Sequence, residues 1–181
     1  MSESIKVYSR PVDVVNILLP KSLEPQHTFI VYTKSNGDQF IYRGGPENGN
    51  MLTDNLKVTT GKYVERAPDY VDPKIFESYQ SQTLKTGENL SSIWKQFERR
   101  EMIVNKMGRD YEPFGNNCNA VVNDALDYIG DKEMTKSWNK FVKENTSIIP
   151  NSDGLMRLGD SSIFSEPLKN PDGTTFFKIA A

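Results

Sequence analysis

The sequence has one cysteine, Cys118, and one histidine, His27, and this scarcity limits its chemistry. A single cysteine excludes an internal disulfide, and one cysteine with one histidine cannot supply the usual four-ligand Cys/His zinc cage. We therefore expect no metal ion at the functional site, and no motif in the sequence implies a cofactor.

Long apolar runs and basic runs are also missing. The chain has no stretch of 18 or more apolar residues, and its first residues, MSESIKVYSRPVD, lack the charged start and apolar core of a secretory signal. The 22 basic and 24 acidic residues are interspersed and give a net charge of −2, which argues against binding nucleic acid or an anionic membrane. We expect synthesis as a soluble cytoplasmic protein without an integral membrane segment, exported only if a dedicated secretion system carries it.

The residues that are present suit one globular domain spanning 1–181. A chain of 181 residues that is 36% hydrophobic can bury one core of ordinary size. Residues 27–45 hold two segments rich in β-branched and aromatic side chains, and Asn36-Gly37 between them predicts a hairpin with this pair at the centre of its turn. In that register His27 lies opposite Pro46.

Three segments show apolar residues at helical spacing. Helices are expected over 90–107, from about Cys118 to a stop at Gly130 with Asn117 as N-cap, and over 132–143. Further strands are expected at 57–60 and at 175–179, the latter after a turn at 171–173. These elements predict an α+β fold in which an antiparallel sheet packs against helices.

The start of the second helix places Cys118 in an unusual setting. Unpaired N–H groups and the helix dipole at that end stabilise an anion, lower the pKa of a thiol and offer donors to an oxyanion. Free cysteines are mostly small buried hydrophobes, but Asn116, Asn117 and Asn119 surround this one with polarity that a core residue does not need. We interpret Cys118 as a nucleophile, and His27 is the only histidine that can serve as its base.

The segment 111–126, YEPFGNNCNAVVNDAL, resembles the cysteine motif of permuted papain-fold hydrolases, with a tyrosine seven positions before the cysteine and Asn-Cys-Asn at its centre. These hydrolases include the permuted NlpC/P60-type enzymes, the lecithin:retinol acyltransferase-like group and the PPPDE group of isopeptidases. In them the histidine strand precedes the cysteine helix, and His27 followed by TFIVY and FIYRGGP matches that order. The likeness covers 27–46 and 111–126 only.

The resemblance implies that Cys118 is the nucleophile, His27 the general base and then acid, and Tyr111 a cleft residue near the oxyanion site. Asn117 would cap or shape that site, and Asn116 would line the cleft beside it. Some family members carry a further polar residue that orients the histidine, and a dyad without one is the alternative. The candidates for that third position are Gln39, Arg43 and Glu47.

The reaction implied by this resemblance is hydrolysis of an amide through an acyl-enzyme. The substrate expected first is a bacterial cell-wall peptide, for a peptidoglycan amidase or endopeptidase that acts as a secreted antibacterial effector with an immunity or delivery protein as partner. The alternatives are an isopeptidase or protease acting on a cellular or host protein, and a non-catalytic binding module with the same fold. A lipid-handling acyltransferase would be expected to carry a membrane segment.

Two other patterns have simpler explanations. The RGGP segment, Arg43 to Pro46, lacks the glycine spacing and the following Lys-Ser/Thr of a phosphate-binding loop, so we expect a turn at a strand end. The carboxylates of Asp110, Glu112 and Asp124 are expected to be helix-surface and capping charges rather than a pair of catalytic acids.

Overall fold

The computed structural model describes residues 2–11, 26–50, 53–67, 69–76, 79–112 and 117–145, and the backbone of 168–169 and 175–176. Its elements in chain order are β1 (Glu3–Pro11), β2 (Gln26–Thr33), β3 (Gln39–Pro46), β4 (Leu56–Lys62), α1 (Pro73–Phe76), β5 (Gln80–Gly87), α2 (Ser91–Met107), α3 (Cys118–Ile129), α4 (Lys132–Glu144), β6 (Leu168–Lys169) and β7 (Thr175–Phe176).

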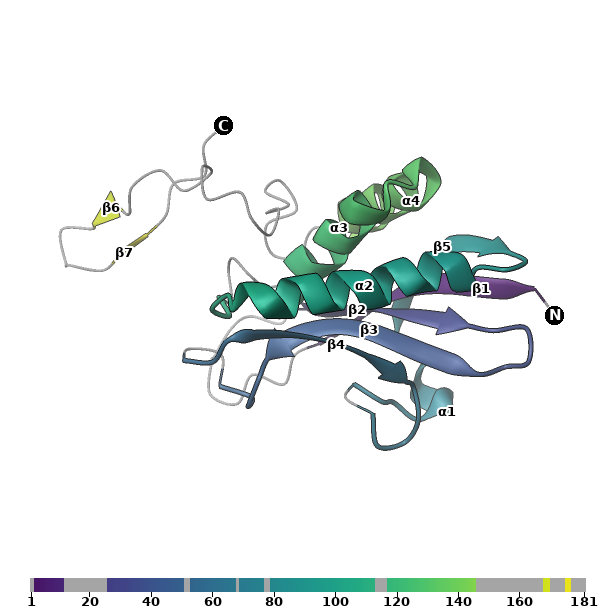
Figure 1. Cartoon of the computed structure of the whole chain (residues 1–181), viewed down its shortest axis with the longest axis horizontal. Coiled ribbons are helices and arrows are strands. Elements are labelled where there is room, and N and C mark those ends of the chain that lie inside the picture. Colours follow the sequence, from purple (N-terminus) through teal and green to yellow (C-terminus); the bar gives the residue numbers. More distant parts are fainter. Residues whose placement is uncertain are drawn as a thin grey trace.

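Strands β1 to β5 form one antiparallel sheet in the order β4-β3-β2-β1-β5 (Figure 1). Strands β6 and β7 pair with each other in a separate two-stranded ribbon. The helices α2, α3 and α4 lie over one face of the five-stranded sheet, and α1 lies on the other side. The predicted α+β class, an antiparallel sheet packed against helices, is confirmed.

Both faces of the sheet are covered, and this explains why six of the eight residues of β2 are buried. Successive side chains of a strand point to opposite faces. Ile30 and Tyr32 of β2 pack toward the helices with Trp94 and Phe97 of α2. The opposite face carries a second cluster, composed of Tyr8, Phe29, Val31, Ile41 and Tyr63, with Ala67, Tyr70, Phe76 and Tyr79 packed against it.

The hairpin between β2 and β3 exists, but its predicted register is wrong by one residue. The N–H of Gly37 donates to the carbonyl of Lys34 at 2.9 Å, and Gly37 alone in this turn has a positive φ, of 90°. Asn36 therefore comes just before the residue with the left-handed backbone, whereas a two-residue turn would place both Asn36 and Gly37 in that conformation. A single left-handed residue at the end of the loop is typical of three-residue hairpin loops. As a result Phe29 pairs with Arg43, one position earlier than the two-residue turn would place it.

The three predicted helices are confirmed as α2, α3 and α4. They were predictable because capping residues close to each end determine where a helix begins and ends. Helix α3 begins at Cys118, and the Asn117 Oδ1 accepts hydrogen bonds from the N–H groups of Asn119 at 2.9 Å and Ala120 at 3.1 Å. It ends at Gly130, whose φ of 70° suits a left-handed C-cap. Strand β4 confirms the strand expected near 57–60, and β7 begins where the last strand was expected, while the turn at 171–173 lies outside the described residues.

The turn predicted for the RGGP segment is wrong, because Gly44 and Gly45 lie within β3. A Cβ atom built on Gly44 would lie 2.5 Å from Cγ2 of Val121 in α3. Glycine at this position therefore lets the helix approach the strand more closely than any side chain would allow. The result is that the start of α3 is seated directly on β3.

Asp124 is a buried residue rather than the predicted surface or capping charge. Its two carboxylate oxygens accept from Nε and Nη2 of Arg100 at 2.6 Å each, which joins α3 to α2. Only 5% of Asp124 is exposed, so this bidentate pair supplies the partner that a buried carboxylate needs.

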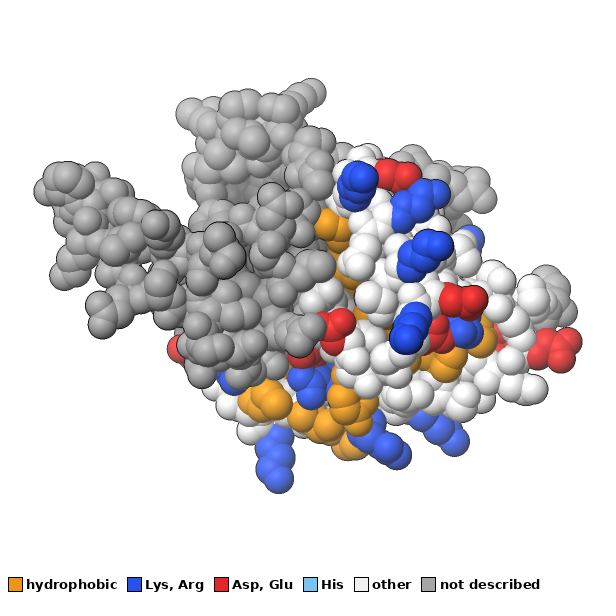
Figure 2. All heavy atoms as spheres, turned by 90° about the horizontal axis from the view of Figure 1, so that it is seen from above, with side chains coloured by type: hydrophobic (Ala, Val, Ile, Leu, Met, Phe, Trp, Pro, Cys, Tyr) orange, Lys and Arg blue, Asp and Glu red, His pale blue; other side chains and the backbone are white. Residues whose placement is uncertain are grey.

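On the helix side the described surface carries charged side chains of both signs, and Met102 and Met107 of α2 are exposed among the hydrophobic ones. In Figure 2 basic side chains stand beside acidic ones among neutral atoms, and hydrophobic side chains appear only in small groups. None of the helices in the described ranges combines the length and the apolar character that crossing a bilayer requires.

Candidate active site

The site lies where β2 and β3 separate. The pairing of β2 with β3 extends from Thr33 only to Phe29, whereas β2 stays paired with β1 as far as Gln26. Residues 26–28 therefore continue past the last β3 pair. The N-terminus of α3 fills this position, because Gly44 allows the helix to lie close to β3.

Cys118 is held against the backbone of β2 at this position. Its Sγ lies 4.0 Å from the carbonyl oxygen of Gln26, and the N–H of Thr28 donates to the sulfur. The Thr28 hydroxyl also donates to Oδ1 of Asn119 at 2.6 Å, which fixes the first turn of α3 to the strand. The thiol is 5% exposed and His27 is 7% exposed, so the two reactive side chains are largely shielded from solvent.

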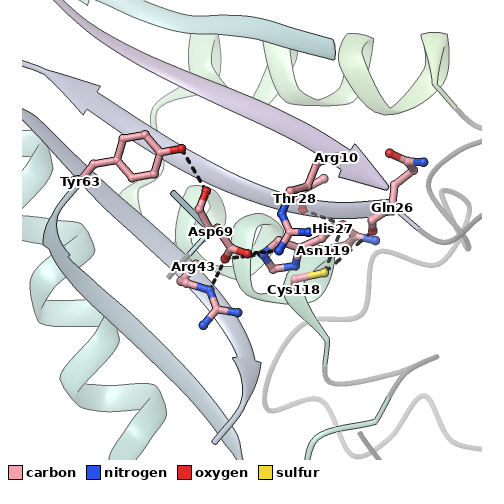
Figure 3. A network of polar contacts seen from close by, with 9 residues as sticks. All are labelled: Arg10, Gln26, His27, Thr28, Arg43, Tyr63, Asp69, Cys118 and Asn119. Atoms are coloured by element: carbon pink, nitrogen blue, oxygen red, sulfur yellow. Dashed lines mark hydrogen bonds and ion pairs between the residues drawn. The ribbon is translucent and has the colours of Figure 1, made fainter. Parts of the chain in front are cut away.

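His27 is bound on two sides. Its Nε2 lies 2.8 Å from Oδ2 of Asp69 (Figure 3), and Cys118 is close enough on the other side to raise the pKa of the imidazole. The imidazole is further stacked on Phe29, with ring centroids 5.9 Å apart and planes inclined by 26°. Thus carboxylate, imidazole and thiol follow one another in the order that a catalytic triad uses.

Asp69 belongs to the loop after β4 and has an uncommon backbone conformation. Its φ is 61°, in the left-handed region that aspartate tolerates better than most residues. The Tyr63 hydroxyl donates to the Asp69 carbonyl oxygen at 3.0 Å, which holds the loop against the second aromatic cluster. The side chain itself is 2% exposed.

Two arginines complete the surroundings of Asp69. Arg10 of β1 hydrogen-bonds to Oδ1 through Nη2, and Arg43 of β3 forms an ion pair with Oδ2 through Nε. Burial disfavours the carboxylate, but His27 and the two arginines outweigh burial and hold the pKa of Asp69 well below its usual range. Asp69 is therefore ionised at every pH at which the protein would work.

The charges of His27 and Cys118 stabilise each other. Burial disfavours the imidazolium, yet the Cys118 charge and hydrogen bonds to Asp69 and Cys118 raise the pKa of His27 to about 9. Burial likewise raises the pKa of the Cys118 thiol, but the imidazolium and the N–H groups of Thr28 and Asn119 lower it overall. Both shifts favour a thiolate–imidazolium pair at neutral pH.

The first turn of α3 provides a donor for an oxyanion. The N–H groups of the first turn have no partner inside a helix, and Asn117 takes up those of Asn119 and Ala120. The N–H of Cys118 is the remaining first-turn donor, next to the sulfur. Tyr111 is partly buried, and burial and the Cys118 charge raise the pKa of its hydroxyl while the Arg43 charge lowers it.

Of the residues predicted to orient His27, Arg43 lies at the site and two do not. Gln39 lies at the opposite end of β3, where its Nε2 donates to the Thr33 hydroxyl at 3.3 Å. Glu47 follows the end of β3 and faces Lys57 at 3.8 Å, with 44% of its side chain exposed. Arg43 reaches Asp69 and thus acts on His27 through that carboxylate. Asn116 lies outside the described residues.

Sequence reasoning missed Asp69, which is the residue that contacts His27. It is 42 positions from His27, in the loop after β4. Neither the left-handed backbone nor the two arginines that converge on it produces a local sequence signal. Within the described ranges, no group of three or more His, Cys, Asp or Glu side chains is placed to hold a metal ion.

A cavity of about 460 Å³ adjoins Asp69 and Arg10. Its other lining residues come from the loop and helix between β4 and β5: Glu65, Ala67, Tyr70, Val71, Asp72, Ile75 and Tyr79. Neither His27 nor Cys118 lines it, so it lies behind the carboxylate and not over the thiol.

Comparisons of this chain with protein-family models, with curated proteins and with solved structures gave no match.

Proposed function

We propose that this protein is a cysteine-dependent amide hydrolase with a permuted papain-like arrangement, in which Cys118 is the nucleophile and His27 the acid–base. The observation that carries the proposal is the position of the His27 imidazole between Asp69 and Cys118, with Nε2 2.8 Å from the carboxylate. Because Nε2 faces Asp69, Nδ1 is the ring nitrogen left for the thiol. The shifted pKa values of both groups support a reactive thiolate.

In the first half-reaction the Cys118 thiolate attacks the carbonyl carbon of the substrate amide. A C–S bond forms, and the carbonyl π electrons move to oxygen, where the N–H of Cys118 donates to the developing charge. The His27 imidazolium then gives its proton to the amide nitrogen, the C–N bond breaks, and an amine leaves. The product is a thioester on Cys118.

In the second half-reaction neutral His27 takes a proton from water, and the oxygen attacks the thioester carbonyl. Collapse of the tetrahedral intermediate breaks the C–S bond, releases a carboxylic acid and restores the thiolate. Asp69 stays ionised and holds the imidazole in place through both steps, which is the role of the carboxylate in a triad.

The substrate proposed first is a peptide of the bacterial cell wall, cleaved by an amidase or endopeptidase that works as a secreted effector. This assignment rests on the resemblance of residues 111–126 to NlpC/P60-type enzymes. An isopeptide or peptide bond in a cellular or host protein is the alternative for the same reaction.

The test is hydrolysis of muropeptides and of isopeptide-linked proteins, with product amines and acids detected by mass spectrometry. We expect cleavage of muropeptides by the wild type and loss of at least about 10²-fold in Cys118→Ala and in His27→Ala. Gln39→Ala is the matched control, because Gln39 lies at the far end of β3 and should leave the rate unchanged. Full activity in Cys118→Ala would place the chemistry elsewhere, and cleavage of isopeptides alone would select the alternative.

A further inference from the structure

The guanidinium of Arg43 has one edge engaged and one edge open. Its Nε faces Asp69, and Figure 3 shows its two terminal nitrogens on the side away from that carboxylate. No hydrogen bond joins these terminal nitrogens to another residue in the part of the chain that the structure describes. Because a guanidinium carries five N–H donors, the open edge can accept a ligand while Nε keeps its contact with Asp69.

Arg43 belongs to the polar network that contains His27 and Cys118 (Figure 3). A Cβ atom on Gly45 would lie 2.6 Å from Nη2 of Arg43, so glycine at this position allows the guanidinium to lie along β3. Arg43 pairs with Phe29, on which His27 stacks, and its charge and that of Cys118 both act on Tyr111. The Arg43 side chain is 20% exposed, which leaves it accessible from the site.

The charge of the site also favours an anion. In its thiolate–imidazolium form the site contains two negative groups, Cys118 and Asp69, and three positive ones, His27, Arg10 and Arg43. One positive charge is thus in excess. A guanidinium edge binds a carboxylate through two parallel hydrogen bonds, which gives orientation as well as attraction.

We infer that Arg43 binds a free carboxylate of the substrate close to the bond that Cys118 attacks. The substrate class is then an amide with a carboxylate on a neighbouring carbon, as in a peptide with a free terminal or side-branch carboxylate beside the scissile bond. An amide in the middle of a longer segment without a neighbouring carboxylate cannot make this contact with Arg43. This inference rests on the proposed function, because it assigns the substrate of the same thiol.

Arg10 provides the matched control. It also contacts Asp69, but from β1, and it lines the cavity that contains Glu65 and Asp72. These two carboxylates make that side unfavourable for an anion. Loss of Arg10 should therefore disturb Asp69 as much as loss of Arg43 does, without removing the anion-binding edge.

The experiment compares alkylation of Cys118 by iodoacetate, which carries a carboxylate, with alkylation by the neutral iodoacetamide. In both cases the thiolate attacks the CH2 carbon, a C–S bond forms and iodide leaves, so the thiol pKa affects both rates equally. The ratio of the two rates is measured for the wild type, Arg43→Gln, Arg43→Lys, Arg10→Gln and N-acetylcysteine as the unassisted thiol.

We expect the iodoacetate-to-iodoacetamide ratio of the wild type to exceed that of N-acetylcysteine by about tenfold or more, as a charge-assisted bidentate contact would produce. Arg43→Gln should lose most of this preference, Arg43→Lys should keep part of it, and Arg10→Gln should keep all of it. A wild-type ratio equal to that of N-acetylcysteine would overturn the inference without any variant. A preference that survives in Arg43→Gln would overturn it as well.

This readout does not depend on hydrolysis, so the two proposals can fail separately. An Arg43-dependent preference in a protein that cleaves no amide would keep the anion site and reject the hydrolase. In an active enzyme, a peptide with a carboxylate beside the scissile bond should exceed its carboxamide analogue in kcat/KM by about tenfold, and Arg43→Gln should remove the difference. Equal rates for the two peptides would reject the carboxylate site and keep the hydrolase.

Discussion

The Nε2 atom of His27 lies 2.8 Å from Oδ2 of Asp69, although 42 residues separate them in the chain. This contact determines which nitrogen of the imidazole is available to the thiol. With Nε2 engaged, Nδ1 is the ring nitrogen left for Cys118, and the ring cannot rotate without breaking a charge-assisted hydrogen bond inside the protein. The geometry of His27 and Cys118 therefore depends on the loop after β4, which is separate from both β2 and α3.

Replacing Asp69 by asparagine should lower activity through His27. The variant keeps the size of the side chain but removes the charge that fixes the imidazole and stabilises the imidazolium. We expect kcat to fall by about 10²- to 10⁴-fold, and the pKa of the Cys118 thiol to rise as the imidazolium is lost. Steady-state kinetics and the pH dependence of alkylation measure the two effects. An Asp69→Asn enzyme with wild-type kcat would reduce the site to a dyad.

The same carboxylate should make stability depend on acid. Because the folded-state pKa of Asp69 lies below its unfolded value of about 3.9, its stabilising effect is complete above that value and is lost as pH falls through the folded-state pKa. We expect Asp69→Asn to be less stable than the wild type by about 3 kcal/mol at pH 6, since it leaves buried cations without their partner. Urea unfolding at pH 6 and pH 3 should show the difference shrinking in acid. An equal difference in stability at the two pH values would mean that Asp69 is not ionised in the folded protein.

The thiol should be reactive at neutral pH because of His27. The pKa of Cys118 is lowered and that of His27 is raised to about 9, so the ion pair persists from below neutrality until His27 loses its proton. We expect alkylation by iodoacetamide to titrate well below the ordinary thiol pKa of about 8.5 in the wild type. In His27→Ala it should titrate near or above 8.5, because burial then acts without a counter-charge. Gln39→Ala should match the wild type; identical profiles in all three proteins would make Cys118 a structural residue.

The helices were predictable because their signals are local. Asn117 and Gly130 define the ends of α3 within the residues that form it, and both act as predicted. Cys118 and His27 were found because they are the only residues of their types. These inferences needed no knowledge of which segments meet in space.

What the sequence did not predict depends on contacts between distant segments. Strands β1 and β5 were not predicted; β5 has a single buried position, Leu84, and pairs with β1, so its strand comes from that pairing more than from its own apolar pattern. The hairpin register was missed because Asn-Gly suits both a two-residue turn and a three-residue loop. Asp69 was missed because its role comes from three partners, on β1, β2 and β3, that meet only in the folded sheet.

Gly44 should be essential for seating α3 on the sheet. An alanine there would place Cβ 2.5 Å from Cγ2 of Val121, so either the helix or the strand must move. We expect Gly44→Ala to destabilise the protein by about 1–3 kcal/mol, as overpacking of a core does. Gly61→Ala in β4 is the matched control, since a Cβ there meets nothing within 4 Å.

A double-mutant cycle separates this clash from a general cost of alanine in a strand. Val121→Ala alone should destabilise by creating a small cavity, whereas in the Gly44→Ala background it should restore part of the stability, because it removes the methyl groups at 2.5 and 3.1 Å but leaves Cβ at 2.9 Å. Chemical denaturation of the four proteins measures the coupling between the two sites. Because the displaced helix carries Cys118, Gly44→Ala should also slow alkylation of the thiol, and the second substitution should recover part of that rate. Additive effects on stability would show that Gly44 and Val121 do not determine how closely α3 approaches β3.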